Sequence, residues 1–241
     1  MADNPGRPTP AFSYHSLQRI GGAAAWLVSA LTLGEVILLT IFPHPASSRA
    51  WFQLFQTRPL IGLLDFWGLE IIMYGMFGLV FLALYTVLKD IHPSAGLIAL
   101  TAALLGTAVF LATNNPFTML SLSRQHAAAP SADQRAALEA AGEAVLALTN
   151  QRAVGGFNIG LLLINTAGLI FSGLMRRSIS FQRSTAVLGL LAFGLSAADT
   201  LRQALTSSIW IALLVIVPGA LLLILWFAIT GSRLIQLGHG K

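Results

Sequence analysis

Residues 59–89 read PLIGLLDFWGLEIIMYGMFGLVFLALYTVLK, and this stretch decides the fold class. It is almost entirely apolar, and a helix of this length, rising about 1.5 Å per residue, crosses the roughly 30 Å hydrocarbon core of a bilayer. Near its start it nevertheless carries two carboxylates, Asp65 and Glu70. Because an ionised carboxylate is costly in hydrocarbon, these two acids require a polar environment beside an otherwise apolar helix.

The whole chain has the composition of an integral membrane protein. Of its 241 residues, 56% are hydrophobic and 10% are charged, and the mean hydropathy is +0.76. A soluble domain carries about 25% charged residues, so this chain cannot cover a water-facing surface. The net charge of +5 does not indicate a nucleic-acid partner, because Lys and Arg are scattered at the ends of apolar runs and do not form one patch.

Six apolar runs approach the length of about 20 residues that a transmembrane helix needs. We expect spans at about 20–42, 60–88, 94–113, 154–174, 184–205 and 209–229. The prediction is an all-α, polytopic integral membrane protein of about six transmembrane helices, with amphipathic helices in the outside loops. Residues 1–241 are expected to form a single membrane domain.

Lys and Arg also predict the orientation, because cytoplasmic loops carry an excess of these residues. The short turn MRRSISFQR, residues 175–183, separates the fourth and fifth spans and is strongly basic. We assign this turn to the cytoplasm. With an even number of spans, both termini are then cytoplasmic.

Two loops on the outer side are expected to contain amphipathic helices. In ASSRAWFQLFQTR, residues 46–58, the aromatic side chains fall on one side of a short helix, which predicts a helix lying at the lipid headgroups. A second helix, over about 131–150, starts with a capping box of Ser131 and Gln134. It carries an apolar stripe of Leu138, Ala141, Val145 and Leu148. This helix either packs over the span ends or the lipid surface, or covers a site below it as a lid.

Polar side chains within the spans fall in the outer half of the predicted membrane region. In the predicted topology the residues between the bilayer centre and the outer surface are Glu35, Glu70, Asn158, Asn165, Asp199 and Arg202. Ionisable residues inside a membrane usually face the protein interior or water. We therefore predict that these residues line one ligand-binding pocket that opens toward the periplasm.

Each of these residues also has a structural interpretation. Asp199 and Arg202 are one turn apart and can pair along their helix, and the two asparagines can bond to a neighbouring helix. Glu35 and Glu70 lie at matching depth on adjacent spans and would repel each other if both were ionised, so one of them should hold a proton. Asp65 precedes Glu70 by five residues, which on a regular helix turns the two side chains about 140° apart.

Motifs for nucleotide binding, zinc hydrolysis or a nucleophilic serine elbow are missing from the sequence. The chain has no cysteine, and its five histidines all lie outside the spans. We therefore expect no catalytic residue, no metal site and no cofactor. His126, near the acids of the long loop, is a weak candidate for a metal ligand, and His44 is expected to be a solvated loop residue.

Residues 114–148, NNPFTMLSLSRQHAAAPSADQRAALEAAGEAVLAL, carry the most specific family resemblance. Other stretches agree with it: QRIGGAAAWL at 18–27, LLDFW and ALYTVLK in the second span, and FSGLMRRSISFQRSTAVLGLLA at 171–192. Over nearly its whole length the chain resembles a bacterial family of multi-span proteins catalogued as domain of unknown function 4386. The resemblance implies a small all-helical protein of the bacterial inner (plasma) membrane, without an assigned activity, and it supplies no catalytic residues.

The residues favour a small transport or binding protein with an outward-facing acidic pocket. Its partners would be the lipid bilayer and a small cation, a proton or an amphipathic ligand. The alternative is a non-catalytic membrane scaffold or regulatory subunit, in which the acids form structural pairs and the loop helix is a docking surface. An intramembrane enzyme acting on a lipid ranks third, because no nucleophile or metal set accompanies the carboxylates. We expect no nucleic-acid partner, and the sequence names no protein partner.

Overall fold

The structure, a computed structural model, describes residues 14–41, 44–149, 158–205 and 208–240. Within these ranges every regular element is helical. The elements are α1 (His15–Ile41), α2 (Ser48–Thr57), α3 (Pro59–Leu63), η1 (Leu64–Gly68), α4 (Leu69–Leu88), α5 (Pro93–Thr113), α6 (Pro116–Ala128), α7 (Ala132–Leu148), α8 (Ile159–Met175), α9 (Arg183–Leu205) and α10 (Ile209–Gly238). Among the described residues, five helical stretches are long and apolar enough to cross a membrane, and α8 is a shorter apolar helix. The predicted all-helical membrane class is confirmed.

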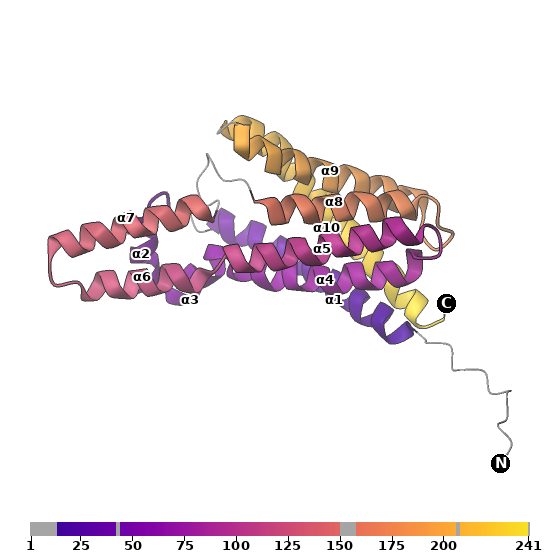
Figure 1. Cartoon of the computed structure of the whole chain (residues 1–241), viewed down its shortest axis with the longest axis horizontal. Coiled ribbons are helices and arrows are strands. Elements are labelled where there is room, and N and C mark those ends of the chain that lie inside the picture. Colours follow the sequence, from indigo (N-terminus) through magenta and orange to yellow (C-terminus); the bar gives the residue numbers. More distant parts are fainter. Residues whose placement is uncertain (1–13, 42–43, 150–157, 206–207, 241) are drawn as a thin grey trace, which may run out of the picture.

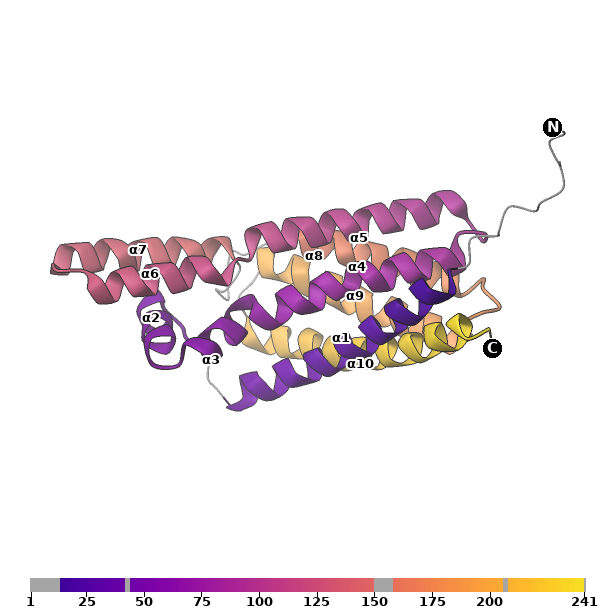
Figure 2. The ribbon, with the colours of Figure 1, turned by 90° about the horizontal axis from the view of Figure 1, so that it is seen from below.

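The apolar helices pack as a ring (Figures 1 and 2). In order around the ring they are α1, α4, α5, α8, α9 and α10, which returns to α1. Two glycine pairs bring backbones into contact. A Cβ on Gly22 would lie 2.7 Å from the carbonyl oxygen of Gly231 between α1 and α10, and a Cβ on Gly106 would lie 2.7 Å from that of Gly160 between α5 and α8. Such close approach is the usual basis of helix association in lipid, where packing replaces the hydrophobic effect.

Aromatic side chains fill the centre of the ring. Phe81 stacks on Phe171 with ring centroids 5.5 Å apart, and Phe193 meets Trp226 edge-on at 4.9 Å. All four are almost fully buried. The outer faces of the helices expose large apolar side chains, among them Leu97, Ile98, Leu214, Leu221 and Leu225. This surface suits contact with acyl chains.

The second span is not one regular helix. Between α3 and α4 the backbone makes a single wide turn, η1, in which Phe66 (φ −94°, ψ 70°) and Trp67 (φ 66°, ψ 5°) leave helical values. Gly68 follows, and its lack of a side chain lets the chain pass directly over a backbone carbonyl of the preceding turn. The regular geometry predicted for Asp65 and Glu70 is therefore wrong, because the chain bends between them.

A helical unit made of α2, α6 and α7 projects beyond one end of the ring (Figures 1 and 2). α7 returns beside α6, and α2 packs against both. Its core gathers the buried side chains of Trp51, Phe52, Phe55, Phe66, Met119 and Leu146. The aromatic face of α2 is thus buried against protein and not against lipid, whereas the position of α2 at the lipid headgroups stays a prediction.

The helix expected near 131–150 is observed as α7. The Ser131 hydroxyl accepts a hydrogen bond from the backbone amide of Gln134 at 3.2 Å, as predicted. The buried positions, however, are Gly142 and Leu146, whereas Leu148 of the predicted stripe is 81% exposed. The small residue Gly142 sets this face, because a Cβ there would approach the side chain of α2 residues to within 3 Å.

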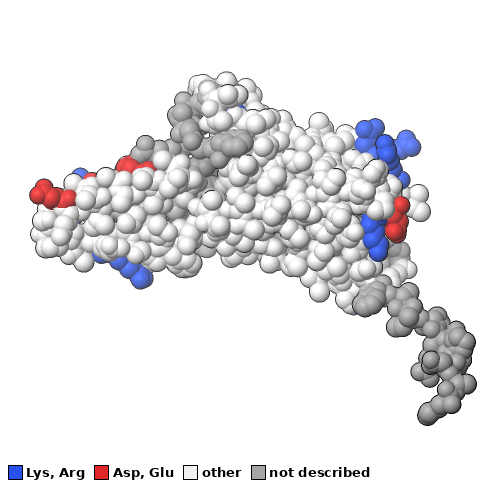
Figure 3. All heavy atoms as spheres, in the orientation of Figure 1, with Lys and Arg blue, Asp and Glu red and all other residues white. Residues whose placement is uncertain are grey.

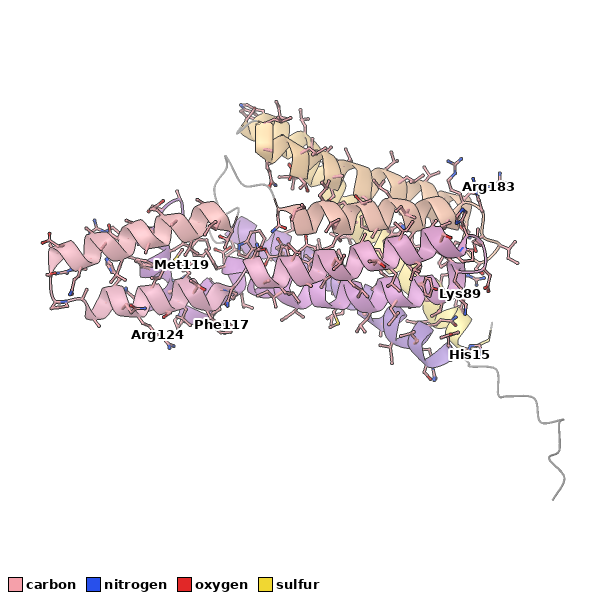
Figure 4. The ribbon with its side chains drawn as sticks, in the orientation of Figure 1. His15, Lys89, Phe117, Met119, Arg124 and Arg183 are labelled. Carbon is pink, nitrogen blue, oxygen red and sulfur yellow. The ribbon has the colours of Figure 1, made fainter. Side chains whose placement is uncertain are left out.

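A cluster of Lys and Arg side chains lies at the end of the ring opposite the projecting unit (Figure 3). Figure 4 labels His15, Lys89 and Arg183 at this end. Here α1 and α9 begin and α4 ends. The ring therefore has one basic end and one end that carries the projecting unit.

Candidate ligand-binding cavity

A cavity of about 180 Å³ lies inside the ring. Its walls come from α1, α8, α9, α10 and the bent η1–α4 segment. Its lining includes Glu35, Glu70, Asn165 and Asp199. The structure thus brings together four of the predicted site residues, whereas Asn158 and Arg202 are not part of the lining.

Glu35 of α1 and Glu70 of α4 form the acidic wall of the cavity. Their carboxyl groups hydrogen-bond to each other, and such a bond needs a proton because two carboxylates offer only acceptors. The bend at η1 places Glu70 in the first turn of α4, where the helix dipole favours negative charge. The Oε2 atom of Glu70 is buried without a hydrogen-bond partner among the described residues. The pair therefore depends on its shared proton, because no N–H or hydroxyl donor of the described residues bonds to Glu70 Oε2.

Asn165 and Asp199 form the α8–α9 side of the lining. Asp199 accepts hydrogen bonds from Arg202 Nε at 2.7 Å and from Gln203 Nε2 at 2.8 Å, so the predicted Asp199–Arg202 pair is confirmed. Asn165 Nδ2 donates to the Thr200 hydroxyl of α9 at 3.5 Å. The charge of Asp199 is compensated within its own helix, and the carboxyl pair is the better candidate to meet a charged ligand.

Asn158 lies at the start of α8. Its Oδ1 accepts hydrogen bonds from the backbone amides of Gly160 at 2.9 Å and Leu161 at 3.3 Å, and its Nδ2 donates to Asn114 Oδ1 at 2.9 Å. Asn114 in turn donates to the carbonyl oxygen of Thr149 at 3.4 Å. Asn158 therefore joins the start of α8 to the ends of α5 and α7.

Aromatic rings complete much of the lining, and the sequence alone did not mark them as site residues. Tyr74 packs on Phe77 with centroids 4.9 Å apart, and Phe77 packs on Phe227 at 4.8 Å. Trp67 also lines the cavity. Aromatic residues in a span usually pack in the core, so they do not stand out. The spacing in the sequence could have identified two of them, because Tyr74 and Phe77 follow Glu70 by four and seven residues and so share its face of α4.

Asp65 lies outside the cavity lining. Its Oδ1 is 3.2 Å from His44 Nδ1, and the two side chains are 1% and 37% exposed, respectively. The His44 ring also meets Trp51 edge-on at 4.9 Å. His44 is an exposed loop residue, as expected, and it also pairs with buried Asp65.

His126 belongs to the projecting unit. Its Nε2 lies 3.0 Å from Glu139 Oε1, and Arg49 Nε lies 4.0 Å from the same oxygen. This group ties α6, α7 and α2 together. Among the described residues, no set of three or more His, Asp or Glu side chains is placed to hold a metal ion.

The family model described as "Domain of unknown function (DUF4386)" matches residues 24–231. The matched range includes every residue that lines the cavity. No curated protein and no solved structure matches the chain. The family description names no activity, so the chemistry has to be read from the cavity.

Proposed function

Since the chain belongs to the DUF4386 family, whose description assigns no activity, we propose a function from the cavity itself. The protein is a small membrane transport or binding protein. It takes a small cationic, amphipathic ligand at Glu35 and Glu70 and exchanges it for the proton that these residues share. The observation that carries this proposal is the carboxyl pair in the cavity wall, which shares a proton and receives no other hydrogen bond at Glu70 Oε2 from the described residues.

The charge and shape of the cavity support a cation. A carboxyl pair that holds one proton carries one negative charge. When that proton leaves, the pair carries two negative charges, and an incoming monovalent cation takes the proton's place, so the net charge of the site stays at one negative charge. The rings of Trp67, Tyr74 and Phe77 in the lining offer faces that attract cations by about 0.5–2 kcal/mol. A volume of about 180 Å³ suits a small organic ammonium ion better than a large lipid.

Two further ionisable side chains support proton exchange at the pair. His44 is exposed and bonds to buried Asp65, and Asp65 interacts electrostatically with Glu35 and Glu70. Histidine is the side chain best suited to take up and release protons near neutral pH. We assign the end with the projecting unit to the outside of a bacterial inner membrane and both termini to the cytoplasm. The cavity then opens outward.

The test is a thermal-stability series with the purified protein across pH, with alkali-metal ions and small alkylammonium ions as probes. Glu70→Gln keeps a hydrogen bond to Glu35 through its amide, so we expect it to fold and to lose the cation-dependent rise in melting temperature. Asp90→Asn removes one exposed acid at the basic end of the ring and is the matched control, which should keep that rise. If no cation stabilises the wild type and Glu70→Gln only destabilises it, the pair is structural and the proposal fails.

The projecting unit favours a second candidate, a regulatory or scaffold subunit. Its α7 exposes Leu148 to 81%, and in a scaffold this side chain would contact the partner protein. In a host that needs this protein for growth, a scaffold role would survive Glu70→Gln and be lost in Leu148→Gln. A transport or binding role predicts the opposite pattern.

A further inference from the structure

A second hollow lies on the outside of the ring, at its basic end. It has a volume of about 730 Å³ and is formed by the start of α5, the end of α8 and the start of α9. Figure 4 labels Arg183, at the start of α9, and Figure 3 shows basic side chains at this end. The hollow is separate from the cavity, with which it shares no lining residue.

This hollow is called the groove below, and its rim is basic. Arg176, Arg177 and Arg183 line it, and all three are exposed. Within the described ranges none of these guanidinium groups forms an ion pair, so their charge is available to a ligand. His92 lies on the same rim, and its Nδ1 accepts a hydrogen bond from the backbone amide of Ala95 at 3.2 Å. In the neutral ring this bond leaves Nε2 as a hydrogen-bond donor.

The remainder of the groove is apolar. Ile170, Leu174 and Leu190 line it together with Gly173. A Cβ placed on Gly173 would meet nothing within 4 Å, so the glycine leaves open space on the outer face of α8. An excess of Lys and Arg is usual in cytoplasmic loops of membrane proteins. This general excess does not explain why an apolar groove lies beside the three arginines.

We propose that this groove binds an anionic phospholipid. The phosphate lies among the three arginines and the His92 donor, and one acyl chain runs along Gly173 between α5 and α9. Guanidinium groups recognise phosphate through paired, charge-assisted hydrogen bonds. Basic pockets between transmembrane helices on the cytoplasmic side are suited to such headgroups. A free phosphate would use the rim but not the apolar part.

Native mass spectrometry of the delipidated protein tests this proposal. Phosphatidylglycerol and phosphatidylcholine with the same acyl chains are offered in turn, with inorganic phosphate as the chain-free probe. We expect the wild type to retain phosphatidylglycerol in preference to the other two. Retention of both lipids to the same extent, or of inorganic phosphate as tightly as the anionic lipid, would overturn the lipid assignment.

Variants separate the groove from general surface charge. Arg183→Gln removes an exposed guanidinium group, and we expect about tenfold weaker binding of phosphatidylglycerol, as for one lost charge-assisted bond. Gly173→Leu fills the groove and should weaken phosphatidylglycerol binding without affecting inorganic phosphate. Arg19→Gln removes an exposed charge at the same end outside the groove and should change nothing. Equal losses in Arg19→Gln and Arg183→Gln would show non-specific attraction and refute the site, and this comparison stands even if Gly173→Leu does not fold.

Discussion

Asn158 acts at one point of the structure, the start of α8. Asn158→Ala removes two hydrogen bonds to the helix N-terminus and the bond to Asn114. A lost N-cap costs about 0.5–2 kcal/mol, and the buried partner left unsatisfied adds about 1 kcal/mol or more. We expect the free energy of unfolding in detergent to fall by about 1–3 kcal/mol, with cation binding retained by the fraction that stays folded. Chemical denaturation followed by circular dichroism measures this change.

Thr166→Ala on the same helix is the matched control. Thr166 is exposed, and its hydroxyl bonds only to the carbonyl oxygen of Leu162 one turn earlier, at 2.8 Å. Its removal should change the unfolding free energy little. Should Asn158→Ala unfold like the wild type and yet lose cation binding, Asn158 would belong to the ligand site and its capping role would be secondary.

The sequence predicts a residue of the cavity lining where its depth in the membrane is enough to place it. Glu35, Glu70 and Asp199 come from helices far apart in sequence, and their common depth was enough to group them. Depth does not decide where a helix begins, and Asn158 precedes α8 as its cap instead of facing inward. That the grouped residues bind a ligand stays a prediction.

The bend at η1 in the second span depends on the close backbone approach at Gly68, and a substitution there tests this. In Gly68→Ala the added Cβ would collide with the backbone carbonyl of Leu63, which cannot move without undoing the turn. Overpacking of this kind costs about 1–3 kcal/mol. We expect a lower melting temperature and, because Glu70 follows the bend directly, weaker cation binding as well. Differential scanning fluorimetry with and without the cation measures both effects.

Gly75→Ala provides the comparison within the same span. A Cβ on Gly75 meets nothing within 4 Å, and Ala is the better helix former, so stability should be unchanged or higher. If the two alanine variants behave alike, the close approach at Gly68 does not hold the bend.

Individual helices were predictable from the sequence where they are long apolar runs, because hydropathy identifies such runs. Hydropathy marks residues 60–88 as apolar but contains no information on the positive φ of Trp67, which tertiary packing has to maintain at a cost of about 1–3 kcal/mol. α6 was not predicted as a helix, although Asn115 and Pro116 form a standard start, an N-cap followed by proline. The aromatic face of α2 was recognised, but the sequence does not say that its partner is protein and not lipid.

The orientation of the whole molecule is open to direct measurement. Because the chain has no cysteine, a single introduced thiol reports its own location. Ala137→Cys lies on the exposed surface of α7, and Ser178→Cys lies in the basic turn between α8 and α9. In intact cells we expect a membrane-impermeant maleimide to label Ala137→Cys at once and Ser178→Cys only after permeabilisation.

Both single-cysteine proteins should first be shown to label fully after solubilisation, which controls for burial of the thiol. The reverse pattern in cells would place the projecting unit in the cytoplasm. The cavity would then open inward, and the lipid groove would face the outer leaflet.

At the scale of the whole molecule, the sequence predicts the class but not the arrangement. Apolar runs predict membrane-spanning helices, because a chain in hydrocarbon has to satisfy its backbone hydrogen bonds internally. They do not say which helices are neighbours, since lipid-facing and protein-facing residues are equally apolar. The contact between α1 and α10 depends on Gly22 and Gly231, which are two of 22 glycines in the chain.

The contact between α1 and α10 also has a consequence for biogenesis. α10 is synthesised after the other ring helices, so α1 and α4 must enter the bilayer before the ring can close. The hydrogen bond between Glu35 and Glu70 joins these two early helices. Sharing a proton reduces the charge that has to be buried during insertion. We therefore expect the acids that line the finished cavity to pair α1 with α4 already during insertion, before α10 closes the ring.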